Sequence, residues 1–380
     1  DAENYRLQAQ DGVTTALELE IGTADVDAWY DVRKGRTAIN HGVSSGHVPS
    51  RMAVMDDVGP GLIPSGDAAH RAATNEELRE ITRLIELGLE RGGLGIGFAL
   101  QYTPAAARSE VMAAFRVAAR FGAPTLVHVR GMGEPPAELG RAGGMDGLRE
   151  VITMATITGA ALHVCHVSSV GLSATQELLA MVENAAGNGL DITTECYPYS
   201  AGMTQIESAL FEPGWEKLTK VGYDELLWPA TGEVITEKLF KKYRAEGGIV
   251  IIHFIPEASM DAAVASPVTA IASDGWIISG AGHPRTAGTY ARTLGRFVRD
   301  KGSLTLVEAI RKSSLMPAQR LERRASIFLR KGRIKVGADA DLSIFNPATV
   351  TDNATYQEPT LPSTGFAHVL VNGVPLVRDG

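Results

Sequence analysis

The sequence has few cysteines, no long apolar run and no recognisable export signal. Only two of its 380 residues are cysteine, Cys165 and Cys196, which excludes a disulfide framework and favours a reducing compartment. No stretch approaches the roughly 20 consecutive apolar residues of a membrane span, and the first residues do not resemble a signal peptide. We therefore expect a globular protein of the cytoplasm without a membrane partner.

The chain also lacks a surplus of positive charge. Its 36 lysines and arginines are outnumbered by 44 aspartates and glutamates, which gives a formal net charge of −8. A surface that binds nucleic acid needs a concentration of basic residues, so we exclude a nucleic-acid partner. We expect a small-molecule partner, and the sequence leaves open whether the chain forms a homo-oligomer.

Segments typical of strands and of amphipathic helices alternate along most of the chain. Strands are predicted at residues 13–21, 37–42, 94–98, 125–130, 161–167, 192–199 and 270–275, with intervening helices at 75–91, 109–120, 146–158 and 173–186. This alternation predicts parallel strands with right-handed crossovers. We expect an α/β fold, a TIM-like (β/α)8 barrel over residues 1–327, with an irregular insertion over its mouth at residues 200–250.

The character of the sequence changes after residue 327. Short strands are predicted at residues 331–334, 337–345 and 368–373. Asn372-Gly373 is a strong signal for a hairpin with a two-residue turn. Three short strands are too few to fold alone. We therefore predict that residues 328–380 form part of a small β-sandwich domain, which needs strands from elsewhere in the chain.

Polar residues stand where several predicted strands end. His128 and His166 end two of them, Asp274 ends the last, and Arg285 follows within a dozen residues. In a parallel barrel the carboxyl ends of the strands form the face that carries the active site. Carboxylates and imidazoles there suit a catalytic metal and a general base. Asp274 alone would equally suit a turn or a helix N-cap, but the three residues together favour a metal site.

Glu18 and Glu20 lie on one face of the predicted strand at 13–21, because side chains alternate along a strand. Buried carboxylates need a positive partner, whereas a surface edge strand would leave them solvated, and both interpretations stay open. His163 lies three residues before His166, so it faces the other side of its strand, and we interpret it as structural.

Several motifs resemble the amidohydrolase superfamily, in order along nearly the whole chain. The segment from Ser273-Asp274-Gly275 to His283-Pro284-Arg285, together with Tyr197-Pro198-Tyr199, resembles the D-aminoacylases (N-acyl-D-amino-acid deacylases, including N-acyl-D-glutamate deacylase) most specifically. The other motifs are Gly12-Val13-Thr14-Thr15, His128-Val129-Arg130, Cys165-His166-Val167 and Gly337-Ala338-Asp339-Ala340-Asp341-Leu342.

The resemblance implies a metal-dependent hydrolase that cleaves the amide bond of N-acyl-D-amino acids. It implies that His128 and His166 hold Zn²⁺, that Asp274 lies at the metal and activates its water, and that Arg285 binds the substrate carboxylate. The other residues that we expect to bind substrate are Tyr197, Tyr199, His283, Arg130 and Gln101.

The sequence departs from the family pattern at three places. The His-x-His of the first barrel strand is absent, and we expect it upstream of where this chain begins, so the number of zinc ions stays at one or two. Where the family has a bridging cysteine, we expect Glu20 to replace it, with Glu18 behind, because a carboxylate also bridges divalent ions. A lysine common two residues after the second histidine is Ser168 here.

Two other functions remain as alternatives. A cyclic amidohydrolase of the dihydroorotase or hydantoinase kind is disfavoured, because the strand at 94–98 lacks the lysine that such enzymes often carbamylate. A barrel that has lost catalysis and only binds ligands is the alternative from another class, and metal analysis separates it from a hydrolase.

Overall fold

A curled parallel sheet forms the centre of the structure. We describe a computed structural model, in which residues 2–57 and 61–380 are described. The sheet has seven strands in the order β1-β2-β3-β4-β5-β6-β11, and every neighbouring pair is parallel. The strands are β1 (Thr15–Thr23), β2 (Asn40–Gly46), β3 (Ile96–Ala99), β4 (Thr125–His128), β5 (Leu162–Val164), β6 (Ile192–Cys196) and β11 (Thr269–Ile271).

The sheet does not close within the part of the chain that the structure describes, because β1 and β11 stand at opposite ends of the strand order. Seven parallel strands are therefore present, and the remaining strand of the (β/α)8 barrel is the first one, which was expected upstream of this chain. All seven lie at the places that the sequence indicated, and the parallel α/β architecture is confirmed. The division at residue 327 stays a prediction.

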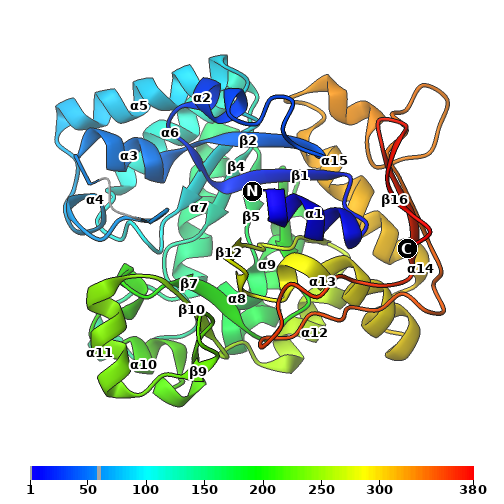
Figure 1. Ribbon diagram of the computed structural model, residues 1–380. Helices are drawn as coiled ribbons and strands as arrows, with labels where there is room; N and C mark the ends of the chain where they lie inside the picture. The colour runs from blue at the N-terminus through cyan, green and yellow to red at the C-terminus, as the bar shows by residue number, and fades with distance from the viewer. Residues whose placement is uncertain (1, 58–60) are drawn as a thin grey trace.

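Helices cover the outer side of the sheet (Figure 1). The four predicted helices are present as α5 (Asn75–Glu90), α6 (Arg108–Phe121), α7 (Gly144–Thr158) and α9 (Thr175–Gly187). The Thr74 side chain accepts a hydrogen bond from the Glu77 backbone N–H, and the Glu77 side chain accepts one from the Thr74 backbone N–H. Helix α5 therefore begins with a complete capping box. The other helices named below or drawn in Figure 1 include α1 (Ala2–Gln10), α2 (Val26–Asp31), α3 (His47–Val54), α4 (Asp67–His70), α8 (Val167–Gly171), α12 (Glu257–Ala265), α13 (Arg285–Arg292), α14 (Leu306–Ile310) and α15 (Met316–Leu321).

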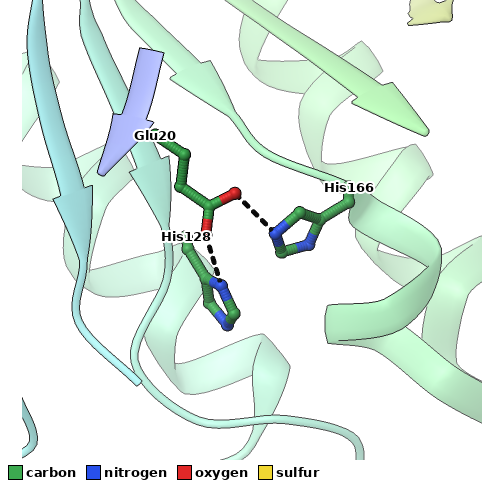
Figure 2. A group of neighbouring side chains, drawn as sticks. All are labelled: Glu20, His128 and His166. Atoms are coloured by element: carbon green, nitrogen blue, oxygen red, sulfur yellow. Dashed lines mark hydrogen bonds and ion pairs between the residues drawn. The ribbon is translucent and has the colours of Figure 1, made fainter. Parts of the chain in front are cut away.

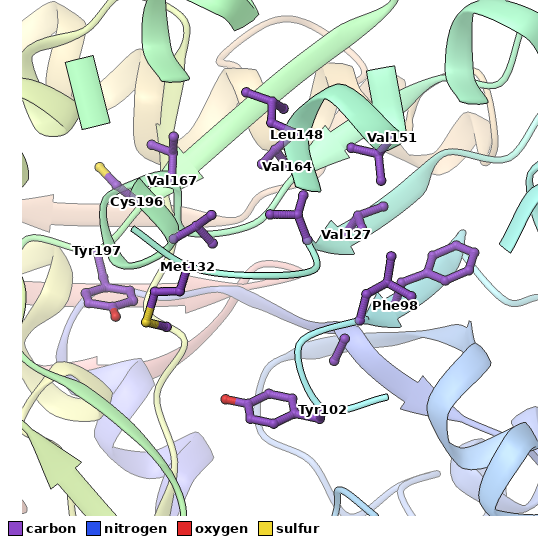
Figure 3. Close-up of a cluster of buried hydrophobic side chains, with 14 of the residues drawn as sticks. Phe98, Tyr102, Val127, Met132, Leu148, Val151, Val164, Val167, Cys196 and Tyr197 are labelled. Atoms are coloured by element: carbon purple, nitrogen blue, oxygen red, sulfur yellow. The ribbon is translucent and has the colours of Figure 1, made fainter. Parts of the chain in front are cut away.

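The main core lies between the sheet and these helices. Val127 and Val164 from β4 and β5 belong to one buried cluster with Leu148 and Val151 of α7 (Figure 3). Burying each such side chain contributes about 1.5–3 kcal/mol. This packing fixes the strand ends from which the site residues project.

The insertion at residues 200–250 is more regular than expected. It forms a four-stranded antiparallel sheet in the order β7-β10-β8-β9, with bounds Gly202–Gln205, Ile249–Ile252, Leu226–Trp228 and Glu233–Val234. Helices α10 (Trp215–Thr219) and α11 (Glu237–Glu246) contact each other through the rings of Trp215 and Phe240, and Tyr243 of α11 stacks on Trp228 of β8. The expectation of an irregular segment was wrong. The strands and helices here are short, so their apolar residues do not repeat often enough to mark a strand or a helix in the sequence. We call this unit the inserted sheet.

The C-terminal strands form a three-stranded antiparallel sheet of β14 (Leu342–Phe345), β15 (Phe366–Val371) and β16 (Val374–Arg378). Its predicted hairpin is confirmed, since Asn372 and Gly373 connect β15 to β16 with φ values of 52° and 81°. Residues 331–334 are not a strand. The Asp341 carboxylate accepts hydrogen bonds from Asn40 Nδ2 at 3.0 Å and from the Asn372 backbone at 2.7 Å. This contact attaches the small sheet to Asn40, the first residue of β2.

None of the helices in the described ranges is both long enough and apolar enough to cross a membrane.

Candidate metal and substrate site

Three side chains from different strands meet at the carboxyl end of the sheet. The Glu20 carboxylate lies 2.9 Å from His128 Nδ1 and 3.0 Å from His166 Nε2 (Figure 2). One ligand atom from each residue lies within 4.8 Å of the others. We call this set the Glu20 group. It joins the two histidines and the glutamate that the sequence suggested as metal ligands.

Local backbone features aim these side chains at one another. The pairing of β1 with β2 shifts register between Glu18 and Thr23, and such an irregularity re-aims the side chains of the strand. His166 comes just after β5 with a φ of 28°, a conformation that a residue with a side chain rarely adopts. Strained backbone of this kind is often found at functional sites.

The charges of the Glu20 group depend on one another. Burial opposes the ionised form of Glu20, but the two histidines outweigh this effect and hold its pKa below the usual range. Burial also disfavours a charged His166, yet Glu20 raises the pKa of this imidazole to about 9. The pKa of His128 is lowered by burial and by the neighbouring His166. The group therefore contains an ionised Glu20, a charged His166 and a neutral His128.

The residues of the Glu20 group fit a divalent metal such as zinc. His128 Nε2 is buried and has no hydrogen-bond partner among the described residues, so this nitrogen is available as a metal ligand. A carboxylate and two imidazoles are typical zinc ligands. Ser169 Oγ lies 2.8 Å from His166 Nδ1 and fixes this ring from behind, as outer partners of metal-binding histidines do.

Asp274 and Arg285 form an ion pair next to this group. Asp274 follows β11, and its Oδ2 lies 2.7 Å from Arg285 Nη2. Partial burial raises the pKa of Asp274 to about 6, although Arg285 opposes this shift. A Cβ atom at Gly275 would lie 2.6 Å from the Thr286 Cα. Glycine at this position therefore allows the start of α13 to approach Asp274 closely.

Arg285 is buried, yet part of its guanidinium group has no partner. Its Nε and Nη1 atoms form no hydrogen bond with any described residue, while its carbon Cζ lies 4.3 Å from the centre of the Tyr197 ring. A buried guanidinium group with unpaired donors suits a carboxylate, which accepts a charge-assisted hydrogen bond from it. The arrangement places such donors beside Asp274.

His283 supports Arg285. Its Nδ1 accepts the backbone N–H of Arg285 at 3.0 Å, and its Nε2 donates to the Ala201 carbonyl at 3.0 Å. Both ring nitrogens are thus engaged, and burial keeps the pKa of His283 well below the usual value. Direct contact between His283 and substrate stays a prediction, whereas its contacts show a positioning role.

Three other predicted substrate-binding residues make contacts within the protein. Arg130 donates to the carbonyls of Pro104 and Ala106 and pairs with Glu150 at 3.2 Å. Gln101 accepts the Gly131 backbone N–H at 2.9 Å. The Tyr199 ring packs edge-on against His283 with a centroid distance of 5.2 Å. These contacts hold loops around the site, and a contact with substrate stays a prediction for all three.

His163 does not join the Glu20 group. Its ring nitrogens lie 2.8 Å from Thr193 Oγ1 and 3.0 Å from Glu195 Oε2, both on β6. These contacts agree with the structural interpretation of this histidine.

Sequence reasoning did not select Tyr102, which borders the site. Its ring packs edge-on against His128 at a centroid distance of 5.2 Å, and its hydroxyl lies 2.8 Å from Thr204 Oγ1. The available signal was its place just after β3, at the carboxyl end of the sheet. Glu18 is not a member of the Glu20 group, and its carboxylate accepts the Gly22 backbone N–H at 3.4 Å.

Comparisons with known proteins identify the family of this chain. The model of the amidohydrolase family matches residues 7–377. A D-aminoacylase of Alcaligenes xylosoxydans xylosoxydans is 28% identical over 359 residues, which are 92% of this chain and 69% of the relative. An N-acyl-D-glutamate deacylase of the same organism is 28% identical over 89% of this chain and 67% of its own length.

One solved structure is similar over nearly the whole chain. It is the N-acyl-D-glutamate deacylase from Bordetella bronchiseptica, complexed with zinc and a phosphonate inhibitor that mimics the tetrahedral intermediate. The TM-score is 0.81 at 25% identity, with 98% of this chain and 81% of that chain covered.

Proposed function

This chain belongs to the amidohydrolase family, and we propose that it hydrolyses the amide bond of N-acyl-D-amino acids. The observation that carries the proposal is the position of the Asp274–Arg285 pair beside the Glu20 group. The Glu20 group offers metal ligands, and the Asp274–Arg285 pair offers a proton acceptor for amide hydrolysis and free donors for a carboxylate. The curated relatives and the zinc-containing structural neighbour support the same reaction.

Glu20, His128 and His166 would hold the zinc ion in this proposal. When bound, zinc polarises the amide carbonyl and lowers the pKa of water toward about 7. Asp274 takes the proton that the attacking water loses. With a pKa of about 6, this carboxyl group is ionised at neutral pH and still releases the proton readily to the departing amine. The oxygen of water joins the acyl carbon, the C–N bond breaks, and a carboxylic acid and a D-amino acid leave.

Arg285 gives the reaction its selectivity for an acyl-amino acid. One of its unpaired donors, Nη1, binds the substrate carboxylate in a charge-assisted hydrogen bond, and Tyr197 supports the guanidinium group from its ring face. His283 fixes the backbone at the start of α13. The substrate is thereby anchored at its carboxylate, with its amide directed toward Asp274.

A panel of N-acetyl-D- and N-acetyl-L-amino acids tests the proposal with the zinc-loaded chain. We expect release of the free D-amino acid, and no release by the Asp274→Ala variant under the same conditions. Zinc binding without turnover of any acyl-amino acid would favour the binding scaffold. Faster turnover of dihydroorotate or hydantoins would favour the cyclic amidohydrolase, although β3 carries no lysine.

We further infer a small-molecule substrate as the partner and the cytoplasm as the location. Cys165 and Cys196 are both buried free thiols, as expected in a reducing compartment. Formation of a homo-oligomer stays a prediction, which light scattering on the purified chain would test.

A further inference from the structure

Strand β7 of the inserted sheet contacts the candidate site at more than one point. Thr204 Oγ1 donates to the Tyr102 hydroxyl at 2.8 Å. The Ala201 carbonyl, just before β7, accepts the hydrogen bond from His283 Nε2 at 3.0 Å. Gln205 Oε1 accepts the Leu62 backbone N–H at 2.7 Å. One short segment therefore connects the inserted sheet with two groups that border the site.

We propose that Thr204 is a positioning residue that holds the Tyr102 hydroxyl toward the substrate. The inference rests on the proposed function and deepens it, since it assigns the inserted sheet a part in forming the substrate pocket. Thr204 acts through Tyr102 and does not itself touch the reacting atoms.

The surroundings of Tyr102 explain why one hydrogen bond matters. The side chain is buried, with 8% of its surface exposed, and its ring edge rests on His128. Figure 3 shows it reaching toward Tyr197 and Met132. A tyrosine hydroxyl keeps its proton at neutral pH. Because Thr204 donates to it, that proton is free to be donated to a substrate oxygen.

The strand provides a rigid base for this contact. β7 pairs with β10 in an antiparallel ladder from Gly202 to Gln205, in which Thr204 lies opposite Val250, so the neighbouring strand holds the Thr204 backbone. The threonine hydroxyl is the group on β7 that bonds to the Tyr102 side chain. Loss of this hydroxyl removes the contact that fixes the direction of the Tyr102 O–H bond and helps to hold the ring against His128.

A double-mutant cycle tests the role of Thr204. The zinc-loaded parent chain, Thr204→Val, Tyr102→Phe and the double variant are compared in kcat, KM and zinc content with an N-acetyl-D-amino acid. Valine keeps the shape and the strand propensity of threonine. We expect Thr204→Val to lower kcat/KM about three- to tenfold with zinc content unchanged. The double variant should lose no more activity than Tyr102→Phe alone, because residues that act as a unit are not additive.

Two further variants separate positioning from stability. Thr204→Ser keeps the hydroxyl and should retain the activity of the parent. Thr219→Val removes another buried threonine hydroxyl of the inserted segment, which bonds the Trp215 carbonyl at 2.9 Å, and should leave kcat/KM unchanged. If Thr204→Val does not fold, the comparison of Thr204→Ser with Thr204→Ala replaces it, with loss expected only for alanine.

Additive losses in the double variant, or full activity of Thr204→Val, would overturn the proposal. Equal losses in Thr204→Val and Thr219→Val would also do so, since they would indicate a general effect on stability. A parent chain without any turnover would contradict the proposed function itself, which is a different outcome from a parent that is active and insensitive to Thr204.

Discussion

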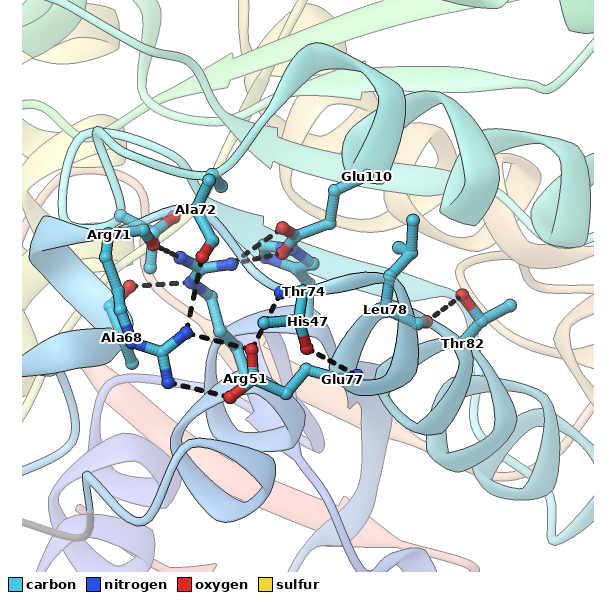
Figure 4. Close-up of polar contacts among 12 residues, drawn as sticks. His47, Arg51, Ala68, Arg71, Ala72, Thr74, Glu77, Leu78, Thr82 and Glu110 are labelled. Atoms are coloured by element: carbon cyan, nitrogen blue, oxygen red, sulfur yellow. Dashed lines mark hydrogen bonds and ion pairs between the residues drawn. The ribbon is translucent and has the colours of Figure 1, made fainter.

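Two buried groups of this protein contain similar residue types but differ in charge, in exposure and in how many of their polar atoms have partners. In the first, His47, Arg51 and Glu110 meet between helices α3 and α6 (Figure 4). In the second, the Glu20 group, two histidines meet a glutamate at the end of the sheet (Figure 2). Each contains a carboxylate held by basic side chains within 3.0 Å. We call the first set the Glu110 group.

The Glu110 group is nearly saturated with partners. Arg51 Nη1 donates to both oxygens of Glu110, Nε donates to the Ala68 carbonyl, and Nη2 donates to the Arg71 carbonyl. All three side chains are almost fully buried, and His47 Nδ1 is the atom of the group without a partner. Although burial opposes it, His47 and Arg51 keep the pKa of Glu110 below its usual range. Such a group connects helices and has little capacity left for a ligand.

The Glu20 group differs in charge and access. It contains no arginine, so no permanent positive charge neutralises Glu20, and the Glu20 side chain is 19% exposed. His128 Nε2 has no described partner, and Asp274 and the free donors of Arg285 lie on the same side of the sheet. The difference shows that unused ligand atoms at an accessible strand end distinguish a site from a structural cluster, whereas residue types alone do not.

The largest expected effect follows from removing a histidine of the Glu20 group. His128→Ala and His166→Ala should each lose zinc and lower kcat by at least about a hundredfold, because the metal supplies much of the catalysis. Metal analysis and turnover measure the two effects. His47→Gln is the matched control, and it should keep its zinc. Full metal content in both alanine variants would show that the comparison is wrong.

The two glutamates of β1 provide a second contrast. Glu20→Gln removes the charge that faces both histidines and should lower the ratio of zinc to protein. Glu18→Gln should leave this ratio unchanged, because the Glu18 carboxylate accepts the Gly22 backbone N–H at 3.4 Å and is not one of the three grouped ligands. Titration with zinc measures both. Loss of metal in the Glu18 variant alone would assign the ligand role to the other glutamate.

Breaking the Glu110 group should affect stability and not chemistry. Arg51→Met leaves the Glu110 carboxylate buried with His47 alone, which should lower the free energy of unfolding by about 3–5 kcal/mol. Urea denaturation measures this change. Zinc content and kcat of the folded fraction should equal those of the parent. The double variant Arg51→Met with Glu110→Leu should recover part of the loss, and a fall in kcat at full zinc content would assign this group to the site.

Much of the sheet could be predicted from the sequence because its signals are local. Apolar runs rich in β-branched residues predicted the strands, and the helix predicted at 75–91 is α5. The Glu20 group could be predicted because parallel strands bring their carboxyl ends to one edge. Thr37 to Gly42 and Thr125 to Arg130 were placed within a few residues of β2 and β4.

The remainder depended on contacts between distant segments. The ring nitrogens of His283 are engaged by Ala201 and Arg285, and no local pattern announces the first of these partners. The inserted sheet is built on aromatic packing among short elements. Lys331 pairs with Asp339 and Asp341 instead of entering a ladder, which explains why residues 331–334 do not form the predicted strand.

The smallest effect compares the two buried arginines. Arg51 uses all its nitrogen atoms within the protein, whereas Arg285 leaves Nε and Nη1 without a described partner. Arg285→Lys keeps the charge and replaces the planar guanidinium group, whose donors point in fixed directions, by a single ammonium group. The loss of a charge-assisted hydrogen bond should lower kcat/KM about ten- to a hundredfold, or ~1.5–3 kcal/mol, with unchanged zinc content. Arg51→Lys, the matched control, should lower stability and leave kcat/KM unchanged.

A substrate whose carboxylate is replaced by a neutral carboxamide decides whether Arg285 binds that group. The parent should lose rate on the carboxamide, because the free donors of Arg285 then face a group without charge. The Arg285→Lys variant has already lost the hydrogen bond from the guanidinium group to the carboxylate, so its further loss of rate on the carboxamide should be small. The same proportional loss in both proteins would mean that Arg285 serves only Asp274, through the 2.7 Å ion pair, and that the carboxylate is bound elsewhere.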